Sequence, residues 1–576
     1  MKKQSILISL FAVACLVGCA GNGNGNGKGG KSGSSSAGGG EDADKSKLVI
    51  NDYGTAVLEA ENFKVDNWYA DESYEDGPVI QESRASGGAY LAAPDKDAGS
   101  EAKFSFELKK DSRVVVYAAY AQMDSQKSQA IDMSKVYHYN IESVSPLSFA
   151  SGKGTLKARS SATTWESMPY LYQDLDKGTY NVTLTIKDEA EACPSIDFLS
   201  FKTTAPEAAP ADPGTVTEAD IPDNDMRNLQ QYKYLLDEDV YAYKTYANGN
   251  DLSAPRGMKL KFDDVETASK YYVQVAESET GLADAAVREA TDKFYYFQNA
   301  KLATKYYYRA ATSEAGLANA AVKNITSTGV APRVVYVPDV LNFRDIGGWE
   351  SSLVPGAKIN QGLYFRCAQL DAAQGSTTSK LDSAGKGKAA LKELGIKCDI
   401  DMRDKGNQPS NGVSAANSAD WPFTFVSAAV PSGSEGVRWE GGTYQGTDIA
   451  KQYVTIFNAI ANCDNEPALL HCTYGADRTG IVSFFLEALL GMNQVDMTRD
   501  YLWTQFTKGR NVKILEADGA EFPQWISKTQ DCEGATFADK MENHLISFGI
   551  DKGTLEHIRE IFIPGYVATA PYTPAA

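Results

Sequence analysis

A cysteine and an arginine in one short segment are the side chains of this sequence best suited to chemistry. The segment reads Leu470-His471-Cys472-Thr473-Tyr474-Gly475-Ala476-Asp477-Arg478-Thr479-Gly480 and lies between a short apolar stretch and an apolar helical stretch. A tight loop between a strand and a helix N-terminus points successive backbone N–H groups into one concave nest, which binds anions. The positions expected to hold a phosphate there are Thr473, Tyr474, Gly475, Ala476 and Gly480.

The same surroundings acidify a thiol. A cysteine beside a helix N-terminus and an arginine can have a pKa of roughly 3.5 to 7.5 instead of about 8.5. Cys472 is therefore expected to be a thiolate at neutral pH and a nucleophile towards phosphorus. The planar guanidinium of Arg478 can grip two phosphoryl oxygens at once. The Thr479 hydroxyl is placed to hydrogen-bond the sulfur and to stabilise it as a leaving thiolate.

This segment resembles the H-C-x5-R-[ST] signature of the protein tyrosine phosphatase superfamily. Four further stretches resemble motifs of one branch, the bacterial tyrosine-phosphatase-like lipoproteins and secreted phosphatases. The resemblance covers residues 336–566 and implies an α/β phosphatase fold, with metal-free hydrolysis of a phosphomonoester, phosphotyrosine above all, through phosphocysteine. The four stretches are Asn342-Phe343-Arg344-Asp345-Ile346-Gly347-Gly348, Gly362-Leu363-Tyr364-Phe365-Arg366-Cys367, Ile400-Asp401-Met402-Arg403 and Asp500-Tyr501-Leu502-Trp503-Thr504.

Two departures from the family pattern bear on substrate and mechanism. Ala476 stands where the branch commonly has Lys, and the missing cation argues against an inositol-phosphate substrate. The sequence contains no Trp-Pro-Asp triplet, so the general acid must come from elsewhere and lie within hydrogen-bond reach of the leaving oxygen. Asp477 is the first candidate and Asp401 the second. Asp345 and Asp404 follow, and for each the alternative is a carboxylate that orients Arg478 or Arg344.

Three neighbouring residues have two interpretations each. His471 either fixes the loop through a ring N–H bonded to nearby backbone or simply packs at a strand end. Cys367 and Cys398 are either redox partners of Cys472 or inert core cysteines, the commoner case. The cysteines are scattered without a C-x2-C pair, which excludes a zinc site and a disulfide framework.

From about residue 336, helical stretches alternate with short apolar strands, which is typical of an α/β domain. The expected helices are 389–394, 453–461 and 480–490, and the expected strands are 396–402 and 468–470. Residues 226–335 instead hold alternating strands. The stretch 302–309 resembles the tyrosine corner of a fibronectin type III domain, which implies a second β-sandwich.

Residues 47–204 are rich in short strands separated by turn residues, which favours a β-sandwich. This region contains, in order, Leu58-Glu59-Ala60-Glu61, Ser86-Gly87-Gly88-Ala89-Tyr90-Leu91, Thr164-Trp165 and Ile196-Asp197-Phe198-Leu199. These segments resemble motifs of carbohydrate-binding modules of families 6 and 35 in the same order, and the resemblance implies a jelly roll. Glu59, Glu61 and Asp197 would then meet at a structural Ca²⁺ site, the only cofactor expected. The alternative is exposed strand carboxylates. Trp165, with Tyr74 or Tyr69, is the candidate platform for a sugar ring, and Trp165 could equally belong to the core.

The N-terminus resembles a bacterial lipoprotein leader. Lys2 and Lys3 precede an apolar run too short to span a bilayer, and Leu16-Val17-Gly18-Cys19 resembles a lipobox. Residues 1–18 are expected to be removed and Cys19 acylated, so that the membrane is reached through lipid only. The remaining boundaries are a Gly/Ser-rich tether over 19–46, a linker over 205–225 and a tail over 567–576.

The net charge of −19 repels nucleic acid and anionic lipid head groups. The expected partners are a phosphorylated protein or a small phosphomonoester, and a glycan. The leading hypothesis is thus an exported, envelope-anchored phosphatase. The alternatives are a non-catalytic receptor for glycans and phospho-ligands, and an inositol-phosphate phosphatase.

Overall fold

The computed structural model describes most of the chain after residue 43. Side chains at 121, 132, 134, 155–156, 165–173, 204, 463 and 523 are not described. Cys19, the leader and most of the tether therefore lie outside the described residues. The described residues are 44–574 without 52–53, 69–76, 82–84, 87–88, 95–98, 122–130, 142–154, 157–164, 189, 206–212, 238–239, 241, 248–249, 263–267, 372–379, 382–384 and 508–520.

A five-stranded sheet organises the C-terminal part of the chain. Its order is β20-β21-β26-β22-β23, and every pairing is parallel except that of β20 with β21. The strand β26, which precedes Cys472, is thus central and buried on both faces. The strands are β20 (Arg344–Asp345), β21 (Tyr364–Cys367), β22 (Cys398–Asp401), β23 (Thr424–Ser427) and β26 (Ala468–His471).

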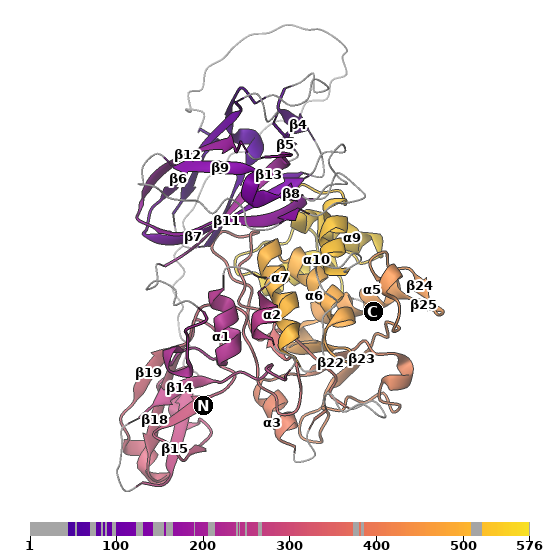
Figure 1. Cartoon of the computed structure of the whole chain (residues 1–576). Coiled ribbons are helices and arrows are strands. Elements are labelled where there is room, and N and C mark those ends of the chain that lie inside the picture. Colours follow the sequence, from indigo (N-terminus) through magenta and orange to yellow (C-terminus); the bar gives the residue numbers. More distant parts are fainter. Residues whose placement is uncertain are drawn as a thin grey trace, which may run out of the picture. The chain divides into compact units, whose positions relative to one another are not determined.

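Helices cover both faces of this sheet (Figure 1). Alternate strand residues face opposite sides. Leu469 packs with Leu391 of α3, whereas Leu470 packs with the helices that follow β23. Helix α6 begins at Asp477, within the segment that holds Cys472 and Arg478, and is buried from Arg478 to Leu489. The helices are α3 (Lys386–Glu393), α4 (Glu435–Arg438), α5 (Ile449–Ala461), α6 (Asp477–Leu489), α7 (Gln494–Trp503), α8 (Glu521–Gln530), α9 (Phe537–Ser547) and α10 (Lys552–Phe562), and a small hairpin pairs β24 (Thr443–Tyr444) with β25 (Thr447–Asp448).

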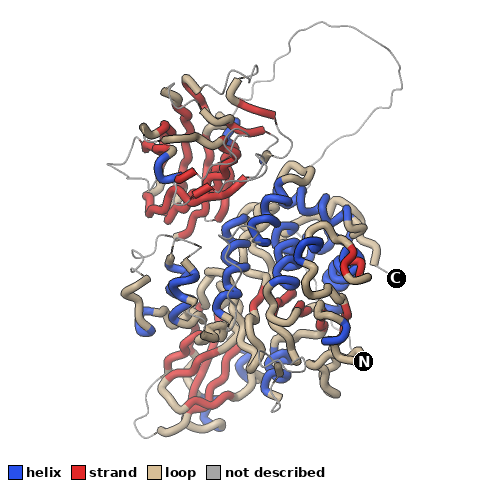
Figure 2. The backbone as a smooth tube through the Cα atoms, turned by 45° about the vertical axis from the view of Figure 1, so that its right-hand side comes forward, coloured by secondary structure: helices blue, strands red, loops and turns tan. Residues whose placement is uncertain are grey.

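The N-terminal region is built from strands, as the sequence predicts (Figure 2). One sheet has the order β1-β6-β12-β9 with β3 beside β6, and the other has the order β11-β7-β13-β5-β4 with β2 beside β13. An apolar core lies between them. The strands are β1 (Lys47–Ile50), β2 (Gly54–Glu59), β3 (Lys64–Asp66), β4 (Val79–Gln81), β5 (Ala89–Leu91), β6 (Glu101–Leu108), β7 (Ser112–Ala121), β9 (Tyr137–Ile141), β11 (Trp165–Leu175), β12 (Gly178–Ile186) and β13 (Ser195–Thr204), and β8 (Ile131–Asp132) pairs with β10 (Thr155–Leu156).

The second module differs from the expected all-β region at its start. Two helices, α1 (Leu229–Leu236) and α2 (Tyr243–Tyr246), precede its strands. Asn228 and Gln231 form a capping box at the first helix, a local signal that the strand-based interpretation missed. The strands form two sheets, one of β14 (Met258–Lys261) and β17 (Phe294–Phe297), the other of β16 (Arg288–Ala290), β15 (Tyr271–Ala276), β18 (Lys305–Ala311) and β19 (Lys323–Thr326). The fibronectin type III assignment stays a prediction.

No helix in the described part of the chain has the length and apolar character needed to cross a membrane.

Candidate active site

The catalytic loop, residues 472–478, joins the central strand β26 to helix α6. Cys472 follows the last strand residue directly, and Arg478 lies in the first turn of the helix. Both are buried: Cys472 is 2% exposed and Arg478 9%. The strand–loop–helix connection that the sequence predicts is therefore present, with its nucleophile beside a helix N-terminus.

Cys472 lies where its thiolate is favoured. Burial would raise its pKa, but the charge of Arg478 and hydrogen bonds from the hydroxyl and amide of Thr479 lower it to about 7. Asp477 opposes this effect slightly, which places its carboxylate within electrostatic reach of the sulfur. A substantial fraction of Cys472 is thus anionic at neutral pH and competent to attack phosphorus.

Arg478 is held along one edge of its guanidinium. Nη1 donates to the carbonyl oxygen of Val430 at 3.1 Å and to Asp404 Oδ2 at 3.2 Å, and Nη2 donates to Thr473 Oγ1 at 3.1 Å. These contacts come from the loops that follow β22 and β23 and from the catalytic loop itself. They fix the guanidinium beside the sulfur before any substrate arrives, as electrostatic preorganisation requires.

His471 braces the start of the loop. Its Nδ1 lies 3.1 Å from the carbonyl oxygen of Cys472, and its Nε2 lies 3.0 Å from Asp399 Oδ1. Burial would lower the pKa of His471, but the charges of Asp401 and Asp399 raise it to about 9. The ring is therefore doubly protonated at neutral pH and can donate from both nitrogens, which supports the loop-fixing interpretation.

The rear of the catalytic loop packs against β21 and the segment before β20. Gly475 has φ +67°, and a Cβ on it would meet the carbonyl oxygen of Cys367 at 2.3 Å, so only glycine fits. Its carbonyl oxygen accepts from Asn342 Nδ2 and from Arg366 Nη2, each at 3.1 Å. Asp500 of α7 in turn binds Arg366 Nη1 at 2.6 Å. All these residues lie in or beside the motifs quoted above.

Asp477 remains the first candidate for the general acid. It is the first residue of α6, is half-buried and influences the sulfur directly. Asp477 belongs to the same loop as Cys472, and its role as the general acid stays a prediction.

Asp401 does not fit the role of general acid. It is fully buried, and Arg403 binds it through Nε at 3.1 Å and Nη2 at 2.7 Å. Burial would raise the pKa of Asp401, but the charge of His471 and the bonds from Arg403 lower it. Asp401 is thus a paired carboxylate that orients its neighbours, and the expectation that it donates a proton is corrected.

The two remaining acid candidates are also structural. Asp345 is fully buried and binds Arg333 Nη1 at 2.7 Å and the amides of Gly347 and Gly362. Asp404 accepts from the amide and hydroxyl of Ser432 and from Arg478. Partial burial would raise the pKa of Asp404, but the bonds from Ser432 and the charge of Arg478 lower it. Asp404 therefore orients Arg478.

The neighbouring cysteines behave as core residues. Cys367 and Cys398 are fully buried and free, and burial raises the pKa of both, that of Cys398 to about 12. Thiols so protonated are poor nucleophiles and resist oxidation. The inert interpretation of these two residues is the better one.

The predicted calcium ligands lie in the N-terminal sandwich. The hydroxyl of Ser86 donates to Glu59 at 2.9 Å, and its amide donates to Asp197 at 2.9 Å. One oxygen on each of Glu59, Glu61 and Asp197 is buried without a hydrogen-bond partner, and such oxygens are the ligand type that Ca²⁺ prefers. However, no group of three or more His, Cys, Asp or Glu side chains among the described residues is arranged to hold a metal ion. Calcium stays a prediction.

The sugar platform is largely outside the described part of the chain. Tyr69 and Tyr74 lie outside it, and Trp165 is described only as the first backbone position of β11.

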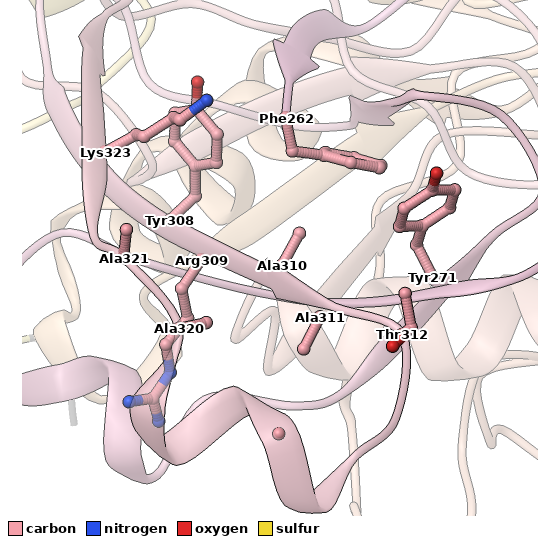
Figure 3. A pocket seen from close by; sticks show the side chains of 11 residues that line it. Phe262, Tyr271, Tyr308, Arg309, Ala310, Ala311, Thr312, Ala320, Ala321 and Lys323 are labelled. Carbon is pink, nitrogen blue, oxygen red and sulfur yellow. The ribbon is translucent and has the colours of Figure 1, made fainter. Parts of the chain in front are cut away.

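A separate pocket opens in the second module, away from every predicted site residue. Rings of Phe262, Tyr271 and Tyr308 line it together with small residues of β18 and the turn after it (Figure 3). Lys323 adds an ammonium group close to Tyr308 in the same view. Sequence reasoning did not single out this pocket, because its rings come from three different strand regions.

Comparison with solved structures concerns the N-terminal region. A family 35 carbohydrate-binding module from Clostridium thermocellum is 13% identical, covering 26% of this chain and 96% of its own, with a TM-score of 0.19. The family 35 module of Abf62 from Cellvibrio japonicus is 17% identical, covering 27% and 99%, with a TM-score of 0.18. A search of curated proteins finds no match.

The sequence of the C-terminal part was also compared with known families. Residues 335–543 match the tyrosine phosphatase family, so the region that holds Cys472 and Arg478 is a domain of that family.

Proposed function

We propose that this chain is a cysteine-dependent phosphatase that hydrolyses phosphomonoesters, phosphotyrosine above all, through a phosphocysteine intermediate. The family match supports a phosphatase, and one observation carries the mechanism. Cys472, with a pKa lowered to about 7, lies at the base of an anion-binding loop with the buried guanidinium of Arg478 beside it. A thiolate and a fixed bidentate cation are what an in-line attack on a phosphoryl group requires.

In the first step, the sulfur anion of Cys472 attacks phosphorus while the bond from phosphorus to the ester oxygen breaks. Asp477 donates its proton to that leaving oxygen, so the alcohol departs neutral. The loop amides and Arg478 bind the equatorial oxygens and stabilise the charge that shifts onto them.

In the second step, the Asp477 carboxylate takes a proton from water, and the water oxygen attacks phosphorus. The sulfur–phosphorus bond breaks, and Cys472 leaves as a thiolate facing Thr479, whose hydroxyl has no other partner among the described residues. Inorganic phosphate is released, and both side chains return to their starting protonation states.

The site selects for a single phosphate group. Position 476 is an alanine, so the loop brings no second cation to the bound oxygens. Asp404, Asp477 and the overall charge of −19 oppose a polyanion at the entrance. Phosphotyrosine therefore fits better than an inositol polyphosphate.

Acylation of Cys19 would anchor the enzyme to the cell envelope, as the leader and tether indicate. The N-terminal sandwich would then bind a glycan and hold the phosphatase near a surface, a role consistent with its likeness to carbohydrate-binding modules.

The direct test is hydrolysis of an aryl phosphate under reducing conditions. Cys472→Ser should lower kcat by about a thousandfold or more. Cys532→Ser, which changes a remote, half-buried cysteine, is the matched control and should leave kcat unchanged. Binding of phosphopeptide without any turnover by the wild type would point instead to a receptor.

The role of Asp477 has its own test. Asp477→Asn should lower kcat by about a hundredfold or more for esters with poor leaving groups. It should affect activated aryl esters much less, because their leaving oxygens need no proton. An equal loss for both ester classes would remove Asp477 from the role.

A further inference from the structure

Two carbonyl groups of the catalytic loop are bound from behind by one side chain. Asn342 Nδ2 donates to the carbonyl oxygen of Tyr474 and to that of Gly475, each at 3.1 Å. Asn342 is 3% exposed and precedes the strand β20, far from the loop in sequence. Arg366 Nη2 donates a second hydrogen bond to the Gly475 oxygen at 3.1 Å. The carbonyl oxygens of these two peptide groups therefore both accept hydrogen bonds from side chains behind the loop.

The orientation of these carbonyls determines the orientation of two amides. In a trans peptide the C=O and the following N–H point to opposite sides of the chain. Binding of the Tyr474 and Gly475 oxygens by Asn342 therefore turns the N–H groups of Gly475 and Ala476 to the opposite, front side. Neither amide donates a backbone hydrogen bond within the described residues. Both amides are thus available to an anion bound in the nest of the catalytic loop.

Asn342 is itself held in one orientation. Its backbone has φ +56°, a left-handed conformation that asparagine tolerates better than most residues. Its Oδ1 accepts from Arg344 Nη1 at 2.5 Å, and a guanidinium can only donate, so the nitrogen of the amide must face the loop. Asp500 binds Arg344 in turn at 2.8 Å. The side chain cannot flip without breaking this chain of bonds.

We propose that Asn342 is a positioning residue that sets the affinity of the catalytic loop for tetrahedral oxyanions. It acts without touching the substrate, by holding the Gly475 and Ala476 amides toward the bound phosphoryl group. The inference deepens the proposed function and rests on it for the identity of the natural ligand. It does not depend on turnover, because a non-hydrolysable oxyanion reports on the same amides.

Three full-length variants test this role. Asn342→Gly keeps a residue that accepts the positive φ but removes the donor. Asn342→Asp keeps the size and replaces the donor with an acceptor that repels both carbonyls. Thr504→Val is the matched control, because Thr504 Oγ1 accepts from Asn342 Nδ2 at 3.4 Å and from Arg344 Nη2 at 3.3 Å and lies at the C-terminal end of α7, outside the catalytic loop. The melting temperature of each variant is recorded alongside.

The readout is protection of Cys472 from iodoacetamide by tungstate. Both Asn342 variants should raise the tungstate concentration for half-protection by about tenfold or more, and Asn342→Asp should raise it most. Thr504→Val should change it less than twofold. Wild-type affinity in Asn342→Gly or Asn342→Asp, or an equal loss in Thr504→Val, would overturn the proposal.

Turnover by the wild type and tungstate affinity of the variants together separate the role of Asn342 from the proposed function. If the wild type hydrolyses no phosphomonoester but its tungstate affinity still depends on Asn342, the positioning role stands and the proposed function falls. If the wild type hydrolyses phosphomonoesters but its tungstate affinity does not depend on Asn342, the proposed function stands and the positioning role falls.

Discussion

Buried carboxylates occur in both the tyrosine phosphatase domain and the N-terminal sandwich, and the two regions treat them differently. Asp500 is fully buried, and Arg344 and Arg366 bind it at 2.8 and 2.6 Å. Asp197 is equally buried, but no ion pair in the described part of the chain involves it, Glu59 or Glu61. One region binds its buried carboxylate with two arginines, whereas in the other the charge of Lys540 acts on Asp197 without an ion pair in the described residues.

The pKa values follow this difference. Burial would raise the pKa of Asp500, but Arg344 and Arg366 lower it. Burial raises the pKa of Asp197 well above its usual value and that of Glu59 to about 7, with Ser86 opposing in both cases. A buried carboxylate without a partner must take up a proton or a cation from solution. The comparison thus separates a carboxylate that arginines hold ionised from carboxylates whose pKa burial raises, and calcium binding at the latter stays a prediction.

Removing one carboxylate from each region gives the largest expected contrast. Asp500→Asn leaves two buried arginines with the more distant carboxylate of Glu487, 3.8 Å from Arg366, and should destabilise its domain by about 3 to 5 kcal/mol. Asp197→Asn in metal-free protein removes a charge that has no ion-pair partner and should cost far less. Hydrogen exchange resolved to α6 and to β13 measures both in the full chain. If the two variants lost hydrogen-exchange protection equally, the two regions would not differ in how they stabilise their buried carboxylates.

Calcium should stabilise only the sandwich. Binding at 100 times its dissociation constant would add about 2.7 kcal/mol to that region by mass action. The three carboxylates must then draw together, since they are not grouped as a metal site in the described structure. Melting curves with calcium and with a chelator measure this shift, and Glu59→Gln should abolish it. A shift that survives Glu59→Gln would assign the calcium to another site.

The pH dependence of stability should have opposite signs in the two regions. Glu59 has a raised pKa, so the metal-free sandwich binds the extra proton when folded and loses stability as pH rises from about 4.5 to about 7. Asp500 and Asp401 have lowered pKa values, so their contribution is present above about pH 4 and is lost as pH falls further. Region-resolved exchange at pH 3, 4.5, 6 and 7.5 tests both signs, because the contribution of Asp500 and Asp401 is lost only below about pH 4. Parallel trends in the two regions would contradict the account.

The parts of the site that follow from local sequence were predictable. The order strand, His471-Cys472, loop, Arg478 and helix lies within one short stretch, so spacing alone indicates an anion nest with a thiol at its base. The structure places β26, the loop and α6 in that order.

The supporting contacts were not predictable, because they join distant segments. Asn342 and Asp500 were quoted in motifs without a role, and only the folded chain brings them behind the loop. Asp401 was the second candidate for the general acid. Its true partner, Arg403, folds back onto it from two residues away, which no periodicity reveals.

The second module shows a different failure. Its strand pattern was recognised, but the helices α1 and α2 before the strands were not. The capping box at Asn228 and Gln231 was the available signal, and the surrounding tyrosines favoured strands by propensity. Tertiary packing decided the outcome, since Tyr234 of α1 contacts Trp503 and Phe506.

The ionisation of one sulfur atom tests the central claim most directly. The rate of Cys472 alkylation by iodoacetamide should be followed from pH 5 to 10 in the wild type, with Cys472→Ser as the blank. The account predicts a midpoint near 7, because Arg478 and Thr479 stabilise the thiolate. A midpoint at or above about 8.5, the value of an ordinary cysteine, would contradict it.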